Sequence, residues 1–175
     1  RLIPSLREVD RIDEREALYH VEEQKMAVPH RKMEYIDLPY ISVSARANFI
    51  SMGGLGEWDY RTGETYRVPY EQGVNIERQC IFDVDGPSME PYYLSGAKVR
   101  ASPVPKSKWP FINSGVYVVV YDDYFVIKRI KTNTFNQGYF VLHSDNTDLA
   151  GSQDVPVEII RSLWRVERVF DAPAR

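Results

Sequence analysis

The feature that most restricts the fold is a run of β-branched and aromatic residues between positions 116 and 130. Residues 116–121 (VYVVVY) and 124–130 (YFVIKRI) both favour strands, and only Asp122 and Asp123 separate them. Two such runs joined by two polar residues are typical of a tight β-hairpin. Further strand-like runs lie at 79–84, 97–101, 138–143 and 157–170. We therefore predict a mainly β domain over residues 38–171.

Residues 1–37 are richer in charged residues than the rest of the chain, and we predict that they form a charged, partly helical linker. Apolar residues recur at helical spacing near its start, and Ser5 is a candidate N-cap. Pro29 and the polar residues 30–32 interrupt this pattern, so we place the linker's end near residues 30–38. We expect a further domain upstream of Arg1, because the segment resembles the middle of a protein.

The charge of the chain argues against direct binding to a polyanion. Lys and Arg total 22 and Asp and Glu total 25, which gives a formal net charge of −3. No global positive field therefore attracts nucleic acid to this part of the protein. A local positive cluster is expected to be a solvated face; it consists of Lys98, Arg100, Lys106 and Lys108.

Cysteine, histidine and glycine usage excludes several kinds of site. The single cysteine, Cys80, lies in an apolar run, which predicts a core residue in a reducing, cytoplasmic environment. The three histidines are widely separated and lack ligand-spaced partners, so we predict no metal. Residues 51–56 are glycine-rich but lack the features of a phosphate or dinucleotide loop, so we predict no cofactor. No apolar stretch is long enough to span a membrane.

Ser88 is the first candidate for chemistry. It lies in the segment 85–91 (DGPSMEP), where glycine and prolines favour a tight turn after a strand. Such a turn can hold a serine hydroxyl outward on a constrained backbone. Taken alone, a serine beside glycine and prolines is most often a turn residue or a helix cap.

Lys128 is the second candidate. Period-two alternation places Val126 and Ile130 on the same face of its strand. An amine between apolar neighbours is partly desolvated, which favours its neutral form, and a neutral amine can take a proton from a hydroxyl. The competing interpretation is a lysine that extends its charge to water from the strand end.

Together with their surroundings, these residues resemble a known family. The matching segments are 86–91 (GPSMEP), Gly96, 115–119 (GVYVV), 126–130 (VIKRI), 142–146 (LHSDN) and 164–166 (WRV). In order and spacing they are similar to the LexA-like self-cleaving repressors and their polymerase-accessory relatives of the UmuD type. The resemblance implies a β-rich fold shared with signal peptidases.

The resemblance also implies an activity, the hydrolysis of a peptide bond in the same chain. Ser88 corresponds to the nucleophile and Lys128 to the general base, a Ser–Lys dyad. The cleavage site corresponds to Ala47–Asn48. Asn48 replaces the family's glycine, and Pro87 lacks the N–H that helps to hold the oxyanion, so the backbone N–H of Ser88 is the remaining donor.

We therefore expect a repressor-type transcriptional regulator that inactivates itself by cutting its tether, as in the SOS response. Its partners are expected to be a second copy of the chain, DNA through the upstream domain, and an inducer such as a recombinase filament or an antirepressor. The resemblance implies dimer contacts from the C-terminal strand around Trp164, Val166 and Val169. The alternative is a cleavage-deficient module that only dimerises or binds a partner.

Overall fold

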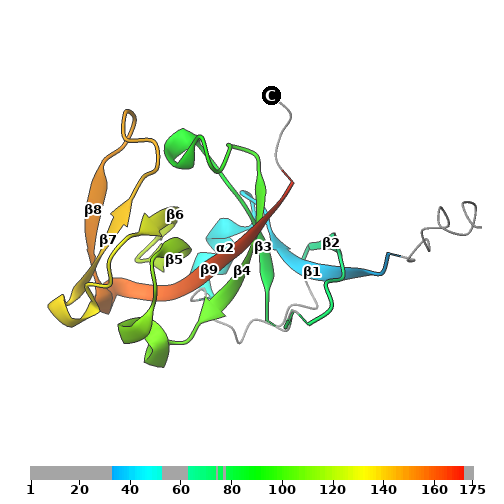
Figure 1. Cartoon of the computed structure of the whole chain (residues 1–175), viewed down its shortest axis with the longest axis horizontal. Coiled ribbons are helices and arrows are strands. Elements are labelled where there is room, and N and C mark those ends of the chain that lie inside the picture. The colour runs from blue at the N-terminus through cyan, green and yellow to red at the C-terminus, as the bar shows by residue number, and fades with distance from the viewer. Residues whose placement is uncertain (1–32, 53–62, 74, 77, 172–175) are drawn as a thin grey trace, which may run out of the picture. The chain divides into compact units, whose positions relative to one another are not determined.

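The structure is a computed structural model, and it describes residues 33–52, 63–73, 75, 76 and 78–171 (Figure 1). The chain divides into two units, Arg1–Met33 and Glu34–Arg175. Apart from Met33, the first unit lies outside the described residues, and so does most of the predicted helical linker. The second unit holds the β-rich domain.

Within the described residues, nine strands form one sheet in the order β2-β1-β3-β4-β9-β5-β6-β7-β8. β1 is parallel to β3, and every other paired neighbour is antiparallel. Figure 1 shows the long strand β9, orange to red, crossing the sheet between β4 and β5. The strands are β1 (Tyr35–Ile41), β2 (Thr65–Pro69), β3 (Cys80–Asp83), β4 (Lys98–Val104), β5 (Gly115–Tyr121), β6 (Tyr124–Ile130), β7 (Tyr139–His143), β8 (Ser152–Pro156) and β9 (Ile160–Asp171).

Short helical turns connect several strands of this sheet. The one described α-helix is α2 (Arg46–Ser51), which follows β1. The 3₁₀ turns in the described part of the chain are η2 (Pro87–Met89), η3 (Lys106–Phe111), η4 (Phe135–Gln137) and η5 (Val157–Ile159). No helix in the described ranges is long and apolar enough to cross a membrane.

The predicted hairpin is confirmed. β5 and β6 pair in register from Gly115↔Ile130 to Tyr121↔Tyr124. Asp122 has a φ of 44°, a left-handed conformation that aspartate tolerates better than most residues and that tight hairpin turns demand. The runs predicted at 79–84, 97–101, 138–143 and 157–170 also contain strands, β3, β4, β7 and β9.

The sheet begins earlier than residue 38, where we placed the start of the β-rich part, because β1 starts at Tyr35. β1, β2 and β8 were not predicted as strands. β1 contains Pro39, and β8 reads SQDVP, so neither carries the run of β-branched residues that marks a strand.

Hydrophobic clusters occupy both faces of the central strands. Alternate residues of β5 divide between them, with Val118 in one cluster and Val119 in the other. Trp164 belongs to the first cluster and is 1% exposed, so its side chain lies in the core of the domain, and the dimer contacts expected from the strand around it stay a prediction. Cys80 is fully buried, as predicted, and burial raises the pKa of its thiol to about 12.

The expectation of a solvated positive face is wrong for Arg100. Its side chain is 5% exposed and forms an ion pair with Glu71 at 3.2 Å. Glu71 also pairs with Arg168, and both guanidinium groups stack on the ring of Phe170. Arg100 therefore stabilises the β4–β9 part of the sheet from inside.

Candidate active site

Ser88 lies at the centre of η2, the short turn that follows β3. Gly86 turns the chain with a φ of 78°, a conformation that few residues other than glycine adopt. Pro87 then opens the turn, and the Glu90 N–H closes it by donating to the Pro87 carbonyl at 3.1 Å. Ser88 is half-buried in this turn, which matches the constrained backbone expected from the sequence.

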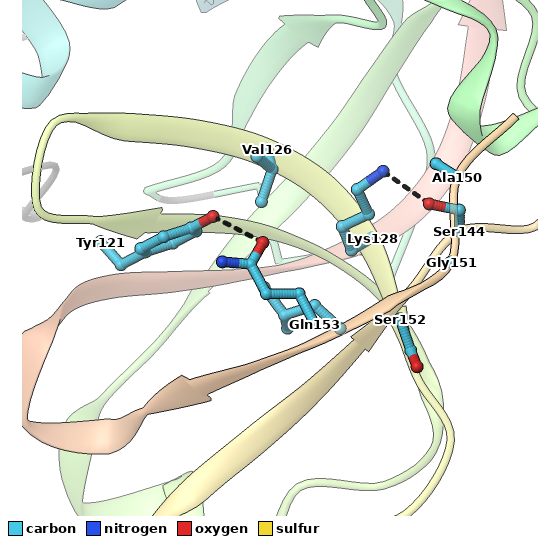
Figure 2. Close-up of a pocket in the computed structure, with 9 residues that line it drawn as sticks. Tyr121, Val126, Lys128, Ser144, Ala150, Gly151, Ser152 and Gln153 are labelled. Carbon is cyan, nitrogen blue, oxygen red and sulfur yellow. Dashed lines mark hydrogen bonds between the residues drawn. The ribbon is translucent and has the colours of Figure 1, made fainter.

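Lys128 lies in the middle of β6 and is half-buried. Burial lowers the pKa of its amine below the usual 10.5, although the nearby Asp145 carboxylate opposes the shift. Its Nζ donates a hydrogen bond to Ser144 Oγ at 2.8 Å (Figure 2). A neutral amine that donates one N–H to Ser144 keeps its lone pair free to accept a proton from another group.

Ser88 and Lys128, forty positions apart, line the same cavity, whose volume is about 140 Å³. η2 directly follows β3, and β3 packs against β6 through the rings of Phe82 and Phe125, whose centroids are 5.7 Å apart. The wall of this cavity, here called the dyad cavity, consists of Arg46, Val84, Asp85, Ser88, Met89, Phe125, Val126, Ile127 and Lys128. A hydroxyl and an amine of lowered pKa therefore line one cavity, whose wall combines apolar side chains with the charged Arg46 and Asp85.

Three consecutive residues after β7 hold the two halves of this site in place. Ser144 accepts from Lys128, as described, and Asp145 binds Arg129 through two hydrogen bonds of 2.6 and 2.7 Å. Asn146 binds the η2 turn, since its N–H donates to the Ser88 carbonyl at 3.0 Å and its Nδ2 to the Pro87 carbonyl at 3.3 Å. Residues 144–146, here called the clasp, thus connect η2 to β6.

The role of the clasp was not predicted. Residues 142–146 were noted only as one of the segments that match the family. The available signal was the run of three polar residues directly after a strand, in a segment that matches the family.

Comparison with known families decides the classification. A family model described as "Peptidase S24-like" matches residues 45–161, more than half of the 175 residues. The chain belongs to the peptidase S24-like family. This is the family of the C-terminal domains of LexA, UmuD and phage repressors, and its members are serine peptidases. A comparison with curated proteins finds no match.

The matched range of the S24-like domain also includes the predicted cleavage site, and the structure gives this site a definite conformation. Ala47 and Asn48 lie in the first turn of α2. The Phe49 N–H donates to the Ala45 carbonyl at 3.0 Å, and the Met52 N–H donates to the Asn48 carbonyl at 3.0 Å. The bond expected to be cut is therefore part of a helix rather than of an extended loop.

Two side chains of α2 anchor it to the rest of the S24-like domain. The Arg46 guanidinium donates to the Asp83 carbonyl at 2.7 Å and to Asp85 Oδ2 at 3.1 Å, and it stacks on the Phe125 ring at 4.6 Å. Phe49 is 1% exposed and packs in the first hydrophobic cluster. Arg46 also lines the dyad cavity, so the segment that contains the predicted cleavage site lies beside Ser88 and Lys128.

A second cavity, of about 260 Å³, lies beside Lys128 (Figure 2). It is lined by Tyr121, Val126, Lys128, Leu142, Ser144, Ala150, Gly151, Ser152 and Gln153. Figure 2 shows the Lys128–Ser144 hydrogen bond on one side, and a hydrogen bond of 3.3 Å between Tyr121 and Gln153 on the other. Lys128 and Val126 belong to the walls of both cavities.

Among the residues that the structure describes, no three His, Cys, Asp or Glu side chains gather in a way that could hold a metal ion. The absence of a metal or cofactor from the whole protein stays a prediction. The Ser88 N–H likewise remains the predicted oxyanion donor.

Proposed function

We propose that the domain is an intramolecular serine peptidase that cuts its own chain between Ala47 and Asn48. In this reaction the Ser88 hydroxyl adds to the Ala47 carbonyl carbon while Lys128 accepts the hydroxyl proton. Lys128 then returns that proton to the Asn48 nitrogen as the peptide C–N bond breaks. A water molecule, deprotonated by the same amine, hydrolyses the resulting ester and frees Ser88.

One observation carries this proposal: the nucleophile, the base and a residue next to the scissile bond line one cavity. Ser88 and Lys128 supply the chemistry, and Arg46 brings the substrate segment to the same wall. The lowered pKa of Lys128 adds support, because it increases the fraction of neutral amine available at a given pH.

The helical state of α2 sets a requirement on the reaction. Helical hydrogen bonds surround the scissile bond, and Phe49 is buried behind it. To bring the Ala47 carbonyl against Ser88, α2 must first open and release its anchors. The cleavage rate is thus limited by the fraction of molecules in which α2 is open, since short segments of a protein can open locally without global unfolding.

The biological role we propose is that of a repressor-type regulator. An upstream part binds DNA, and this domain pairs with a second copy. Such pairing raises operator affinity through effective concentration, so separating the upstream part from this domain weakens DNA binding. An inducer, such as a recombinase filament or an antirepressor, acts by favouring the open state of α2.

Incubation of the purified chain at alkaline pH tests the peptidase proposal. We expect mass spectrometry to detect a fragment that begins at Asn48. The Ser88→Ala and Lys128→Ala variants serve as controls and should stay intact. A wild-type chain that remains as intact as Ser88→Ala after prolonged incubation contradicts the proposal.

The second candidate is a domain that dimerises or binds a partner without cleaving itself. Pro87 and Asn48 favour it, because the first removes an oxyanion donor and the second replaces the family's glycine. A fluorophosphonate probe separates the two functions. Labelling of Ser88 that is lost in Lys128→Ala supports the peptidase, whereas unlabelled protein favours the binding module.

A further inference from the structure

The strand β1 lies upstream of the proposed cut, yet it is an internal strand of the sheet. β2 lies on one side of it and β3 on the other. The register with β2 runs from Tyr35↔Pro69 to Pro39↔Thr65, and Tyr40 and Ile41 pair with β3. Both neighbours follow the cleavage site in the sequence, so they belong to the downstream product.

Side chains of β1 are buried against residues of the downstream product. Leu38 is 5% exposed and packs with Val68 of β2 and Ile81 of β3. Ile41 is fully buried in the same cluster as Phe82. These contacts resemble those of a domain core rather than those of a tether.

Polar contacts hold the end of β1 that is nearer to the cut. The Tyr40 hydroxyl donates to the Asp83 carboxylate at 2.8 Å, and the Val43 N–H donates to Asp83 Oδ2 at 3.3 Å. The Tyr40 N–H donates to the Glu64 carbonyl at 2.8 Å. Each acceptor again lies in the downstream product, and no contact in this set includes the Ala47–Asn48 bond.

From these contacts we infer that self-cleavage leaves the upstream product bound, with β1 still inserted between β2 and β3. The inference rests on the proposed function, since it concerns the state that follows the cut. Hydrolysis breaks one C–N bond and consumes one water, but it removes none of the hydrogen bonds or buried contacts of β1. The downstream product is thus a receptor for an extended strand with apolar residues at the positions of Leu38 and Ile41.

The consequence for regulation is that cutting and separation are two steps. The upstream product leaves only when β1 is extracted from the sheet, which exposes two buried side chains and the edges of two strands. A partner that pulls or competes for β1 therefore controls the lifetime of the nicked protein.

Native and denaturing measurements on the same cut sample test this inference. A denaturing gel reports whether the chain is cut, which concerns the proposed function alone. For the cut sample, we expect native mass spectrometry to give one species that is heavier than the uncut chain by one water. Separate fragments in the native measurement, together with two bands on the gel, overturn the inference while leaving the peptidase proposal intact.

A second experiment does not depend on self-cleavage. Residues 1–47 and 48–175 are co-expressed as two chains, with a purification tag on the downstream piece only. We expect the tagged piece to retain the upstream piece through purification and to release it in denaturant. Loss of the upstream piece under native conditions contradicts the inference even if the intact chain never cuts itself.

Variants of β1 identify the contacts that retain the upstream piece. Ile41→Ala should weaken retention of the upstream piece at least about 30-fold, because it removes a fully buried side chain. Ile41→Val, which is milder and safer for folding, should weaken it about two- to tenfold. Tyr35→Ala is the matched control, since Tyr35 is on the same strand but 54% exposed, and it should change retention less than about twofold. Equal effects of the three variants contradict the assigned role of the buried positions.

Discussion

Replacing Asp85 with asparagine tests whether the opening of α2 limits self-cleavage. The Asp85 carboxylate lies 3.1 Å from Arg46 Nη1, and the two side chains are 55% and 15% exposed respectively. Asparagine keeps the size and shape of the side chain but removes its charge. The other anchors of Arg46, the Asp83 carbonyl and the Phe125 ring, remain. The substitution therefore weakens the closed state of α2 without unfolding the domain.

The expected size of the effect follows from the exposure of the pair. Exposed ion pairs contribute about 0.2–1 kcal/mol, and the partly buried Arg46 places this one in the upper half of that range, at about 0.5–1 kcal/mol. Since 1.4 kcal/mol corresponds to a factor of ten, the open fraction of α2 rises about two- to fivefold. If opening precedes chemistry, the cleavage rate rises by the same factor.

Two assays measure the opening of α2 and the cleavage rate separately. Hydrogen exchange of the Phe49 and Met52 amides, followed in a Ser88→Ala background that cannot cut, reports the opening of α2. Fragment yield over time at alkaline pH reports cleavage with Ser88 intact. We expect Asp85→Asn to raise both by the same two- to fivefold factor.

The control removes a similar ion pair elsewhere. Asp37→Asn breaks the exposed pair with Arg67, which joins β1 and β2 rather than α2, and it should leave both readouts unchanged. If Asp85→Asn speeds hydrogen exchange of the α2 amides but leaves the cleavage rate unchanged, opening of α2 does not limit cleavage. A slower cleavage rate also contradicts the gating role of α2, because it assigns Asp85 a role in the chemistry.

Four further predictions concern the chemistry and the stability of the domain. The cleavage rate should rise with pH and level off below pH 10.5, because burial lowers the pKa of Lys128 and only the neutral amine accepts a proton. A rate that still rises above pH 10.5 contradicts the role of Lys128 as the base. Pro87→Ala restores an N–H and should speed cleavage by up to about 100-fold in a time course. Ser144→Ala removes the hydroxyl that orients Lys128, so it should slow cleavage about tenfold or more but change the free energy of unfolding by only about 1 kcal/mol. Ser144→Thr keeps a hydroxyl and should restore the cleavage rate. Glu71→Ala leaves Arg100 buried without its carboxylate, so urea titration should find a loss of about 3 kcal/mol.

The parts of the fold that could be predicted are those with local signals. The β5–β6 hairpin carries its own alternation and its own turn, so both strands and the Asp122 conformation follow from neighbouring residues. β1 carries no such signal, because it contains Pro39 and pairs with β2 and β3, which lie further along the chain. β8 pairs with the preceding strand β7, but its sequence SQDVP has no run of β-branched residues. The burial of Arg100 was missed because its partner Glu71 lies 29 positions away.

The candidate site divides in a similar way. A serine in a Gly-Pro turn and a lysine in an apolar strand were visible as separate features, and only the family resemblance predicted that they belong together. The helical state of Ala47–Asn48 was not predicted, because residues 46–51 (RANFIS) form a short helix anchored by tertiary contacts of Arg46 and Phe49. The clasp was missed because its effect depends on a loop that contacts a turn 59 positions away.

The position of Lys128 between two cavities bears on the second half of the reaction. In the proposed reaction, an ester on Ser88 places the chain upstream of the cut in the dyad cavity, next to Lys128. The 260 Å³ cavity on the Ser144 side borders the same lysine, so it is a second space in which water can be held next to the base for hydrolysis of the ester.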